Sequence, residues 1–335
     1  MSRLHVVTGK GGTGKTTVAA ALALALAEEG RRTLLVEVEG RQGIAQLFET
    51  EALPYEERKI AVGPGGGEVY ALAIDAERAL LDYLQMFYKL GGAGRALRKI
   101  GAIDFATTIA PGVRDVLLTG KVCEAVRRRT RDGRSVYDAV VMDAPPTGRI
   151  ARFLAVNDEV AGLARVGPIH NQAQAVMRVL KSPETAVHLV TLLEEMPVQE
   201  TVDGVAELRA AKLPVGCVVV NMTRPALLER ASVRAAEESR TEIAKALSRA
   251  GLGGARRGGR AEQLVEPLLR QAHEHAERVA LEGELRDEIA RLGLPAYELE
   301  LLTEGADLPG VYQLAGELRE QGLGGQGQGE QEVVT

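Results

Sequence analysis

Cysteine is scarce in this sequence, and long apolar runs are lacking. The two cysteines, Cys123 and Cys217, lie far apart in apolar surroundings, so we expect buried core residues and neither a disulfide framework nor a zinc cluster. No stretch approaches the ~20 consecutive apolar residues that cross a bilayer. Strand-like sequence begins at residue 4, which leaves no room for a signal peptide. We therefore expect a cytoplasmic protein without an integral membrane segment.

A basic excess is also lacking. The chain has 41 Lys and Arg residues against 46 Asp and Glu residues, which gives a net charge of −5. General nucleic-acid binders usually carry a basic excess, so we expect no nucleic-acid partner. The local basic run at 127–129 is interpreted as a solvated helix end. The 335 residues, 45% of them hydrophobic, suffice to bury a large core.

Apolar, β-branched runs alternate with helical stretches along most of the chain. Continuous apolar runs are typical of strands buried on both faces, as in parallel sheets. The alternation predicts an α/β fold with a doubly wound, mostly parallel sheet flanked by helices. Ligands of such sheets bind beyond the carboxyl ends of the strands. The strands are predicted at 4–7, 33–38, 69–74, 137–142, 186–191, 216–220 and 296–299.

Two mainly helical regions interrupt this alternation. One is a predicted helical subdomain at about 76–130, and the other is a charged helical insertion at about 226–292. The Gly- and Gln-rich tail, 321–335, is predicted to be disordered. No internal repeat is present, so residues 1–320 are predicted to form a single domain.

A glycine-rich segment follows the first predicted strand and precedes a helix predicted at 16–29. It reads G-K-G-G-T-G-K-T and matches the Walker A pattern of P-loop ATPases. Glycines allow positive φ, so that backbone amides point at phosphate oxygens, and the helix N-terminus adds to that field. We expect Lys15 to reach the β- and γ-phosphates of ATP, Thr16 to ligate Mg²⁺ and Thr17 to bind the α-phosphate. The predicted loop residues are Gly9, Lys10, Gly11, Gly12, Thr13, Gly14, Lys15, Thr16 and Thr17.

A second candidate segment follows the strand predicted at 137–142. Asp143 ends that strand, where a carboxylate can hold Mg²⁺ through water, and a Pro-Pro turn leads to Gly148, whose amide can approach a γ-phosphate. Read alone, Asp143 is equally well an acid that caps a turn. The Walker A segment favours the metal role.

These segments resemble the ArsA-like family, which includes the arsenite-pump ATPases and the ATPase that delivers tail-anchored membrane proteins. Lys10 resembles the extra lysine of the family's deviant Walker A loop. Residues 143–154 resemble its second switch, D-T-A-P-T-G-H-T-x-R-F-L. Further similar motifs are Pro111-Gly112, Ser182–Thr185, Glu200-Thr201, Val218–Asn221 and the segment with Asp307 and Gly310.

The resemblance implies a function and a set of roles. It implies a slow ATPase that uses ATP and Mg²⁺ and works as a homodimer or as a heterodimer with a related chain. Lys10 would reach across the dimer to the partner's nucleotide, Asn221 would recognise adenine, and Asp307 would flank the nucleotide. Glu39, Lys10 and Lys15 are then the catalytic candidates, with Thr16 and Asp143 at the metal.

The first switch departs from the family pattern D-P-A-x-x-L-S-D. Here Glu39 and Gly40 stand where the family has Asp and Pro. One extra methylene moves a carboxylate by roughly 1 Å, and a misplacement of that size costs ~10²-fold in rate unless the backbone adjusts. Glu37, two residues earlier, is a reserve candidate. The alternative is that both are ordinary solvated acids.

Two thiol features of some relatives are also missing. The chain has no C-x-x-C pair and no cysteine cluster. Soft metalloid ions prefer thiolates, so arsenite binding is not expected and the arsenite-pump role is disfavoured.

The sequence leaves three functions open. The favoured one is a dimeric MgATP-hydrolysing switch that handles a hydrophobic polypeptide or a membrane partner. The second is a weakly active or regulatory subunit of a paired complex, which the altered first switch supports. The third, a positioning ATPase that binds DNA or membrane, lacks a basic surface or an amphipathic tail. An apolar client groove would use Met86, Phe87, Tyr88, Ile100, Ile103 and Phe105, which would otherwise only pack the helical layer.

Overall fold

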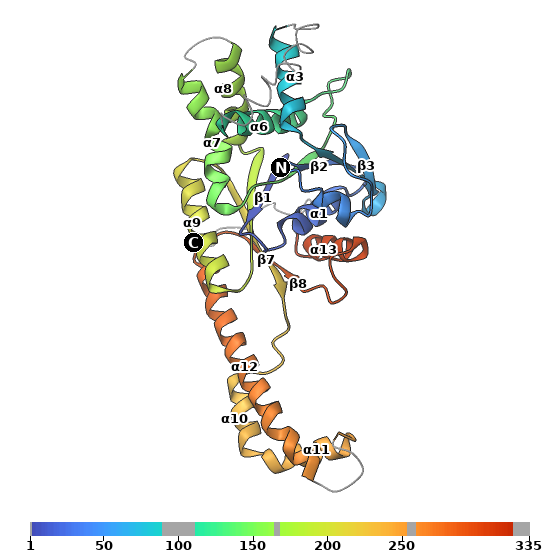
Figure 1. Ribbon diagram of the computed structural model, residues 1–335, viewed down its shortest axis with the longest axis vertical. Coiled ribbons are helices and arrows are strands. Elements are labelled where there is room, and N and C mark those ends of the chain that lie inside the picture. The colour runs from blue at the N-terminus through green and yellow to red at the C-terminus, as the bar shows by residue number, and fades with distance from the viewer. Residues whose placement is uncertain (1, 89–110, 164–167, 253–258, 324–335) are drawn as a thin grey trace, which may run out of the picture.

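A computed structural model describes residues 2–88, 111–163, 168–252 and 259–323 of the chain (Figure 1). Its centre is an eight-stranded sheet in the order β3-β4-β2-β5-β1-β6-β7-β8, in which only the β3–β4 pair is antiparallel. The predicted mostly parallel α/β fold is therefore confirmed. The strands are β1 (Leu4–Gly9), β2 (Arg32–Glu37), β3 (Arg58–Val62), β4 (Glu68–Ala73), β5 (Ala139–Asp143), β6 (Thr185–Thr191), β7 (Val215–Thr223) and β8 (Ala296–Glu300).

β3 is the strand that the sequence pattern does not predict. It lies at the edge of the sheet, antiparallel to β4, and none of its residues is fully buried. The pattern that identified the other strands was a continuous buried apolar run, as in β1 and β5. An edge strand with charged residues such as Arg58 and Lys59 gives no such signal.

Helices cover both faces of the sheet. On one face α1 (Lys15–Leu26) packs against α13 (Leu308–Glu320), and α1 is almost entirely buried because its Ala and Leu residues fit between the sheet and its neighbour. An Arg319–Glu28 ion pair joins α13 to the loop after α1. The short α2 (Gly43–Leu47) follows β2. The other face carries α6 (Pro111–Arg127), α7 (Thr147–Leu163), α8 (Pro168–Leu180) and α9 (Glu195–Ala210), with α3 (Ala76–Tyr88) packed on α6.

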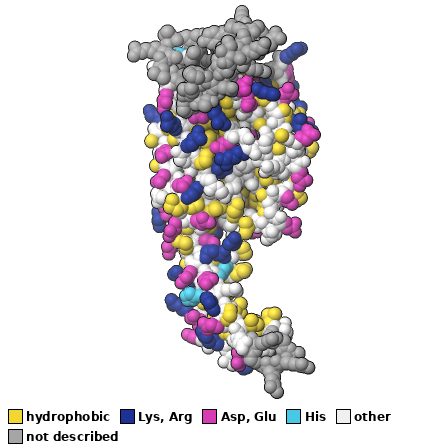
Figure 2. Space-filling view, in the orientation of Figure 1, with side chains coloured by type: hydrophobic (Ala, Val, Ile, Leu, Met, Phe, Trp, Pro, Cys, Tyr) yellow, Lys and Arg dark blue, Asp and Glu magenta, His cyan; other side chains and the backbone are white. Residues whose placement is uncertain are grey.

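The predicted charged insertion forms an arm that projects from the sheet (Figure 1). In it α10 (Arg230–Glu238) and α11 (Arg240–Arg249) pack on the long α12 (Gly259–Ala290). On the face drawn in Figure 2, basic and acidic side chains alternate along the arm, so no field of one sign dominates there. Among the described residues, no helix combines the length and the apolarity that a membrane crossing requires.

Some sequence expectations lie outside the described residues. These are most of the tail, 324–335, and part of the charged helical insertion, 253–258. The expected client groove also falls there: Ile100, Ile103 and Phe105 belong to an undescribed segment, and the side chains of Met86, Phe87 and Tyr88 are not described.

A buried hydrogen-bonded chain crosses the three neighbouring strands β1, β6 and β7. His5 Nε2 lies 3.2 Å from the Ser2 carbonyl oxygen, His5 Nδ1 lies 3.0 Å from His188 Nε2, and His188 Nδ1 lies 2.9 Å from Cys217 Sγ. A carbonyl can only accept, so His5 Nε2 donates; His188 Nε2 then donates to His5, and the Cys217 thiol donates to His188. Both imidazoles are neutral in this arrangement.

The two buried, neutral histidines predict that the protein loses stability in acid. Burial lowers the pKa of His5 to about 4 and, with His5 nearby, that of His188 to about 3. In the unfolded chain both rings protonate near pH 6.5. The unfolded state therefore binds more protons as the pH falls from 6.5 toward 4, and each histidine should remove up to about 1.4 kcal/mol of unfolding free energy per pH unit.

Chemical denaturation between pH 7.5 and 4.5 measures this effect. The control is the His5→Gln, His188→Gln double variant, which keeps hydrogen-bonding side chains but cannot protonate. Its stability should fall less steeply with acid than that of the wild type. Parallel pH curves for the two proteins would show that the histidines are not responsible.

Candidate functional site

The glycine-rich loop connects β1 to α1, and two of its glycines have positive φ. Gly12 and Gly14 have φ of 90° and 82°, which L side chains rarely adopt. A β-carbon at Gly9 would overlap the carbonyl oxygen of Val190 on the neighbouring β6. The hydroxyl of Thr13 donates to the Lys10 carbonyl oxygen at 2.9 Å and closes the turn. The loop thus brings its backbone amides to the start of α1, where the helix dipole also favours an anion.

Asn221 supports this loop from β7. Its side chain is buried, and its Nδ2 donates to the Thr13 carbonyl oxygen at 2.9 Å. A β-carbon at Gly14 would overlap that amide nitrogen, so the loop and Asn221 can approach this closely only with glycine there. The structure therefore gives Asn221 a loop-bracing contact that the sequence does not reveal.

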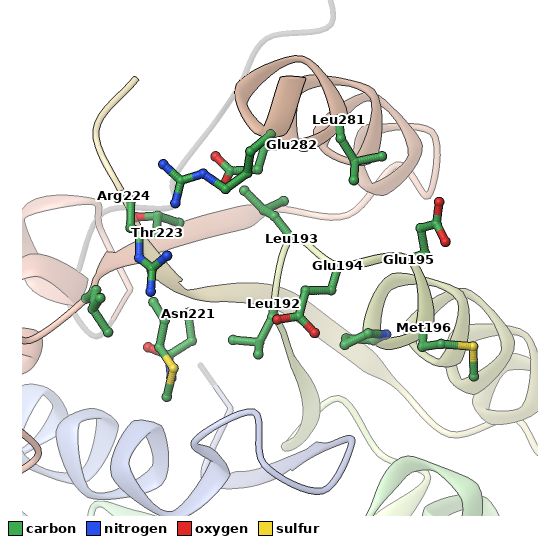
Figure 3. Close-up of a pocket in the computed structure, with 14 residues that line it drawn as sticks. Leu192, Leu193, Glu194, Glu195, Met196, Asn221, Thr223, Arg224, Leu281 and Glu282 are labelled. Carbon is green, nitrogen blue, oxygen red and sulfur yellow. The ribbon is translucent and has the colours of Figure 1, made fainter. Parts of the chain in front are cut away.

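A cavity of about 590 Å³ opens beside Asn221 (Figure 3). It lies between the end of β7, the N-terminus of α9 and α12, and Asn221 lines the side nearest the glycine-rich loop. Leu192 and Leu193 give it apolar walls, while Glu194 and Glu282 contribute carboxylates. Arg224 and Arg278 also line it, and Arg278 pairs with Glu282 at 3.6 Å, so the lining combines apolar surface with a few charged, hydrogen-bonding side chains, a combination typical of small-molecule sites.

The expected metal residues lie together. The Thr16 hydroxyl donates to Asp143 Oδ2 at 2.7 Å, because Asp143 ends β5 beside β1 and Thr16 lies in the first turn of α1. Burial raises the pKa of the Asp143 carboxyl to about 6, a rise that the Thr16 hydrogen bond and the Lys15 ammonium oppose. The Glu37 and Glu39 carboxylates add to the rise.

A hydroxyl beside a carboxylate fits Mg²⁺, which takes hard oxygen ligands. In the part of the chain that the structure describes, no group of three or more His, Cys, Asp or Glu residues is placed to hold a metal alone. Mg²⁺ is usually held by one or two protein oxygens together with water and substrate phosphates. Thr16 and Asp143 are the residues that would hold it.

Glu37, the reserve candidate for the first-switch carboxylate, is instead engaged in hydrogen bonds to the backbone. It is buried at the end of β2, and its carboxylate accepts hydrogen bonds from the backbone N–H groups of Gln42, at 2.5 Å, and Ile44, at 3.3 Å. It therefore caps α2 and fixes the loop at 38–42. A carboxylate so engaged is not free to orient water.

Glu39 lies two residues beyond the end of β2. Its carboxylate is 3.6 Å from the Arg41 guanidinium, and the side chain is 24% exposed. It lines a small pocket of about 110 Å³ together with Arg114, Arg149 and Pro145. Arg41 follows Gly40 and Arg149 follows Gly148, so the two candidate switch segments meet in this pocket.

Lys10 is held within the chain. Its Nζ is 3.1 Å from Glu200 Oε1, and the other oxygen of Glu200 accepts a hydrogen bond from the Thr147 hydroxyl at 3.2 Å. Sequence reasoning identified Glu200 only as part of a motif and gave it no role. A contact between α9, the loop and the start of α7 depends on the tertiary fold, so the sequence carries no local signal for it.

The remaining candidate residues have different surroundings. Gly148 lies in the first turn of α7 with open space around it, beyond a turn that Thr8 fixes by donating to the Pro145 carbonyl oxygen at 2.7 Å. Asp307 caps α13, where its Oδ1 accepts from the Gly310 backbone N–H at 2.9 Å. Lys15 is buried at the start of α1, and Thr17 follows in the same turn.

Comparison with known proteins shows which proteins the chain is similar to. Residues 2–183 match the family model described as anion-transporting ATPase. The chain is 53% identical to ATPase BagA of Mycobacterium tuberculosis over 96% of this chain and 94% of that protein. It is 27% identical to ATPase GET3 of Kluyveromyces lactis over 64% of this chain and 70% of that protein.

The Thr16–Asp143 pair predicts how Mg²⁺ binding should respond to mutation. Asp143→Asn keeps the size of the side chain but removes its charge, so the gain in ATP affinity that Mg²⁺ provides should shrink by about 10- to 100-fold. Titration of a fluorescent ATP analogue with and without Mg²⁺ measures this. Asp138→Asn, directly before the same strand, is the matched control and should behave as wild type, since the amide oxygen can still accept from the Arg32 backbone N–H. An unchanged Mg²⁺ effect in Asp143→Asn would remove Asp143 from the metal site.

Proposed function

Because the chain belongs to the ArsA family of anion-transporting ATPases, we propose that it is a MgATP-hydrolysing switch that works as a dimer. The observation that carries this proposal is the Thr16–Asp143 hydrogen bond at the mouth of the glycine-rich loop. It joins the helix that would receive the phosphates to the segment that would sense the γ-phosphate.

The proposed substrate placement follows the described geometry. The phosphates lie over the loop amides and the N-terminus of α1, with Lys15 as counter-charge. Asn221 and the adjoining cavity receive the base, whose amino group can donate to a carboxylate of the rim. Bound Mg²⁺ supplies charge neutralisation on the phosphate oxygens.

Two residues would complete hydrolysis. Lys10 reaches the partner's nucleotide and stabilises the charge of the transferring phosphoryl group, as an arginine finger does elsewhere. Glu39 positions the attacking water, for which it must leave Arg41 and turn toward the γ-phosphate. Gly40, at φ 70°, gives the segment the freedom for that movement.

The client is proposed from the family resemblance to be a hydrophobic polypeptide or a membrane partner. The alternative, a weakly active or regulatory subunit of a paired complex, is supported by the Glu39–Arg41 ion pair, which holds the altered switch residue in the small pocket. An arsenite-pump role has little support: Cys123 and Cys217 are both buried, and burial raises the pKa of the Cys123 thiol to about 12.

The proposed dimer predicts the effect of Lys10→Ala. ATP binding should stay within a few-fold of wild type, because Lys15 and the loop amides remain, whereas ATP-dependent dimerisation and turnover should be lost. Sedimentation with a non-hydrolysable ATP analogue measures the first effect, and phosphate release measures the second. Lys59→Ala removes another ion-paired surface lysine, at the far edge of the sheet, and should change neither. Normal dimerisation and turnover in Lys10→Ala would contradict the trans role.

The proposed role of Glu39 predicts that its mutation lowers the hydrolysis rate and leaves the affinity for MgATP unchanged. Glu39→Gln should bind MgATP normally and hydrolyse it at least ~10²-fold more slowly, since positioning is the main protein contribution to phosphoryl transfer. Single-turnover hydrolysis at saturating MgATP is the measurement, with the exposed Glu51→Gln as control. Wild-type turnover in Glu39→Gln would mean that another group orients the water or that this chain is a non-catalytic subunit.

A further inference from the structure

Glu200 connects two parts of the site that are distant in sequence. It lies on α9, and its two carboxylate oxygens have different partners: Lys10 Nζ at 3.1 Å and the Thr147 hydroxyl at 3.2 Å. Lys10 belongs to the glycine-rich loop, and Thr147 begins α7 directly before Gly148. A single side chain thus joins the loop lysine to the second switch.

The position of Glu200 is fixed by the packing of its helix. Val198, Thr201 and Val205 are buried on α9, and the Thr201 hydroxyl donates to the Pro197 carbonyl oxygen at 2.8 Å. One turn beyond Glu200, a β-carbon at Gly204 would lie 3.2 Å from Leu189 and 3.5 Å from the Thr147 methyl group, so α9 runs very close to the start of α7. The backbone that carries Glu200 is therefore held in place.

The ion pair itself is exposed and easily exchanged. The Lys10 and Glu200 side chains are 30% and 36% exposed, and such surface pairs typically change an equilibrium constant by a factor of only about 1.4 to 5. A phosphate group offers the same ammonium more negative charge than one carboxylate. Glu200 can thus hold Lys10 and still release it to a phosphate.

We propose that Glu200 is a positioning residue that holds Lys10 within its own protomer, so that Lys10 must leave Glu200 before it engages the partner's nucleotide. This inference rests on the proposed function, because it requires the trans role of Lys10. The Thr147 hydrogen bond makes the release sensitive to the second switch: when Gly148 approaches a γ-phosphate, Thr147 moves with it and Glu200 loses one of its two partners.

The restraint has a measurable consequence. Dimerisation breaks one Lys10–Glu200 ion pair in each protomer. Because each pair changes the equilibrium constant by a factor of about 1.4 to 5, removing both should tighten the ATP-dependent dimer by about 2- to 25-fold. The ion pair affects the equilibrium between free protomers and the dimer, before Lys10 engages the partner's nucleotide. The turnover rate of the saturated dimer should therefore stay the same.

Glu200→Gln is the test variant, because the amide oxygen still accepts from Thr147 while the charge that holds Lys10 is gone. Sedimentation at a series of concentrations of a non-hydrolysable ATP analogue gives the dimer constant, and hydrolysis at saturating MgATP gives kcat. We expect a tighter dimer with kcat within about twofold of wild type. Glu207→Gln, an equal charge change at an exposed position of the same helix, should leave both quantities unchanged.

The outcomes separate the two proposals. A wild-type chain that does not dimerise with the ATP analogue contradicts the proposed function itself. A wild type that dimerises, with a Glu200→Gln dimer that is equally tight or weaker, overturns the inference alone. Glu200→Asp provides a second variant: it keeps the charge but is one methylene too short to span both partners, so its dimer constant should lie between those of wild type and Glu200→Gln.

Discussion

The register between β1 and β5 is the constraint on which the candidate site depends. Val7 pairs with Asp143 in this parallel ladder, so both strands end at the same edge of the sheet. α1 begins just beyond β1, which brings the Thr16 hydroxyl to the Asp143 carboxylate. A slip of one residue would turn Asp143 to the other face of the sheet, and the fully buried side chains of β1 and β5 prevent that slip.

Three acids reach this edge, and their surroundings give them different tasks. Asp143 faces Thr16, Glu37 binds the backbone of its own loop, and Glu39 pairs with Arg41. Identical chemistry at neighbouring positions therefore gives a carboxylate paired with a hydroxyl, which we propose as the metal ligand, a helix cap, and an ion-paired acid, which we propose as the switch residue. The same division applies to the two loop lysines: Lys15 is buried at the helix start, whereas Lys10 is exposed enough to exchange partners.

The sequence predicts best what local patterns determine. The buried runs of β1 and β5 and the glycine-rich loop have strong local signals, so the sheet and the Thr16–Asp143 neighbourhood could be predicted from them. β3 could not, because a half-exposed edge strand needs no apolar run. The cap that Glu37 provides and the bridge that Glu200 forms were also missed, because their partners are set by the fold of a loop and by the packing of α9.

The most direct test of the account is turnover in a mixture of two inactive variants, Lys10→Ala and Glu39→Gln. In a mixed dimer, the nucleotide site of the Lys10→Ala protomer keeps its own Glu39 and receives Lys10 from the partner. Each mixed dimer has one complete site where the wild-type dimer has two, so turnover should rise well above that of either variant alone and reach at most half of the wild-type rate. A mixture as inactive as its separate components would contradict a site completed across the dimer.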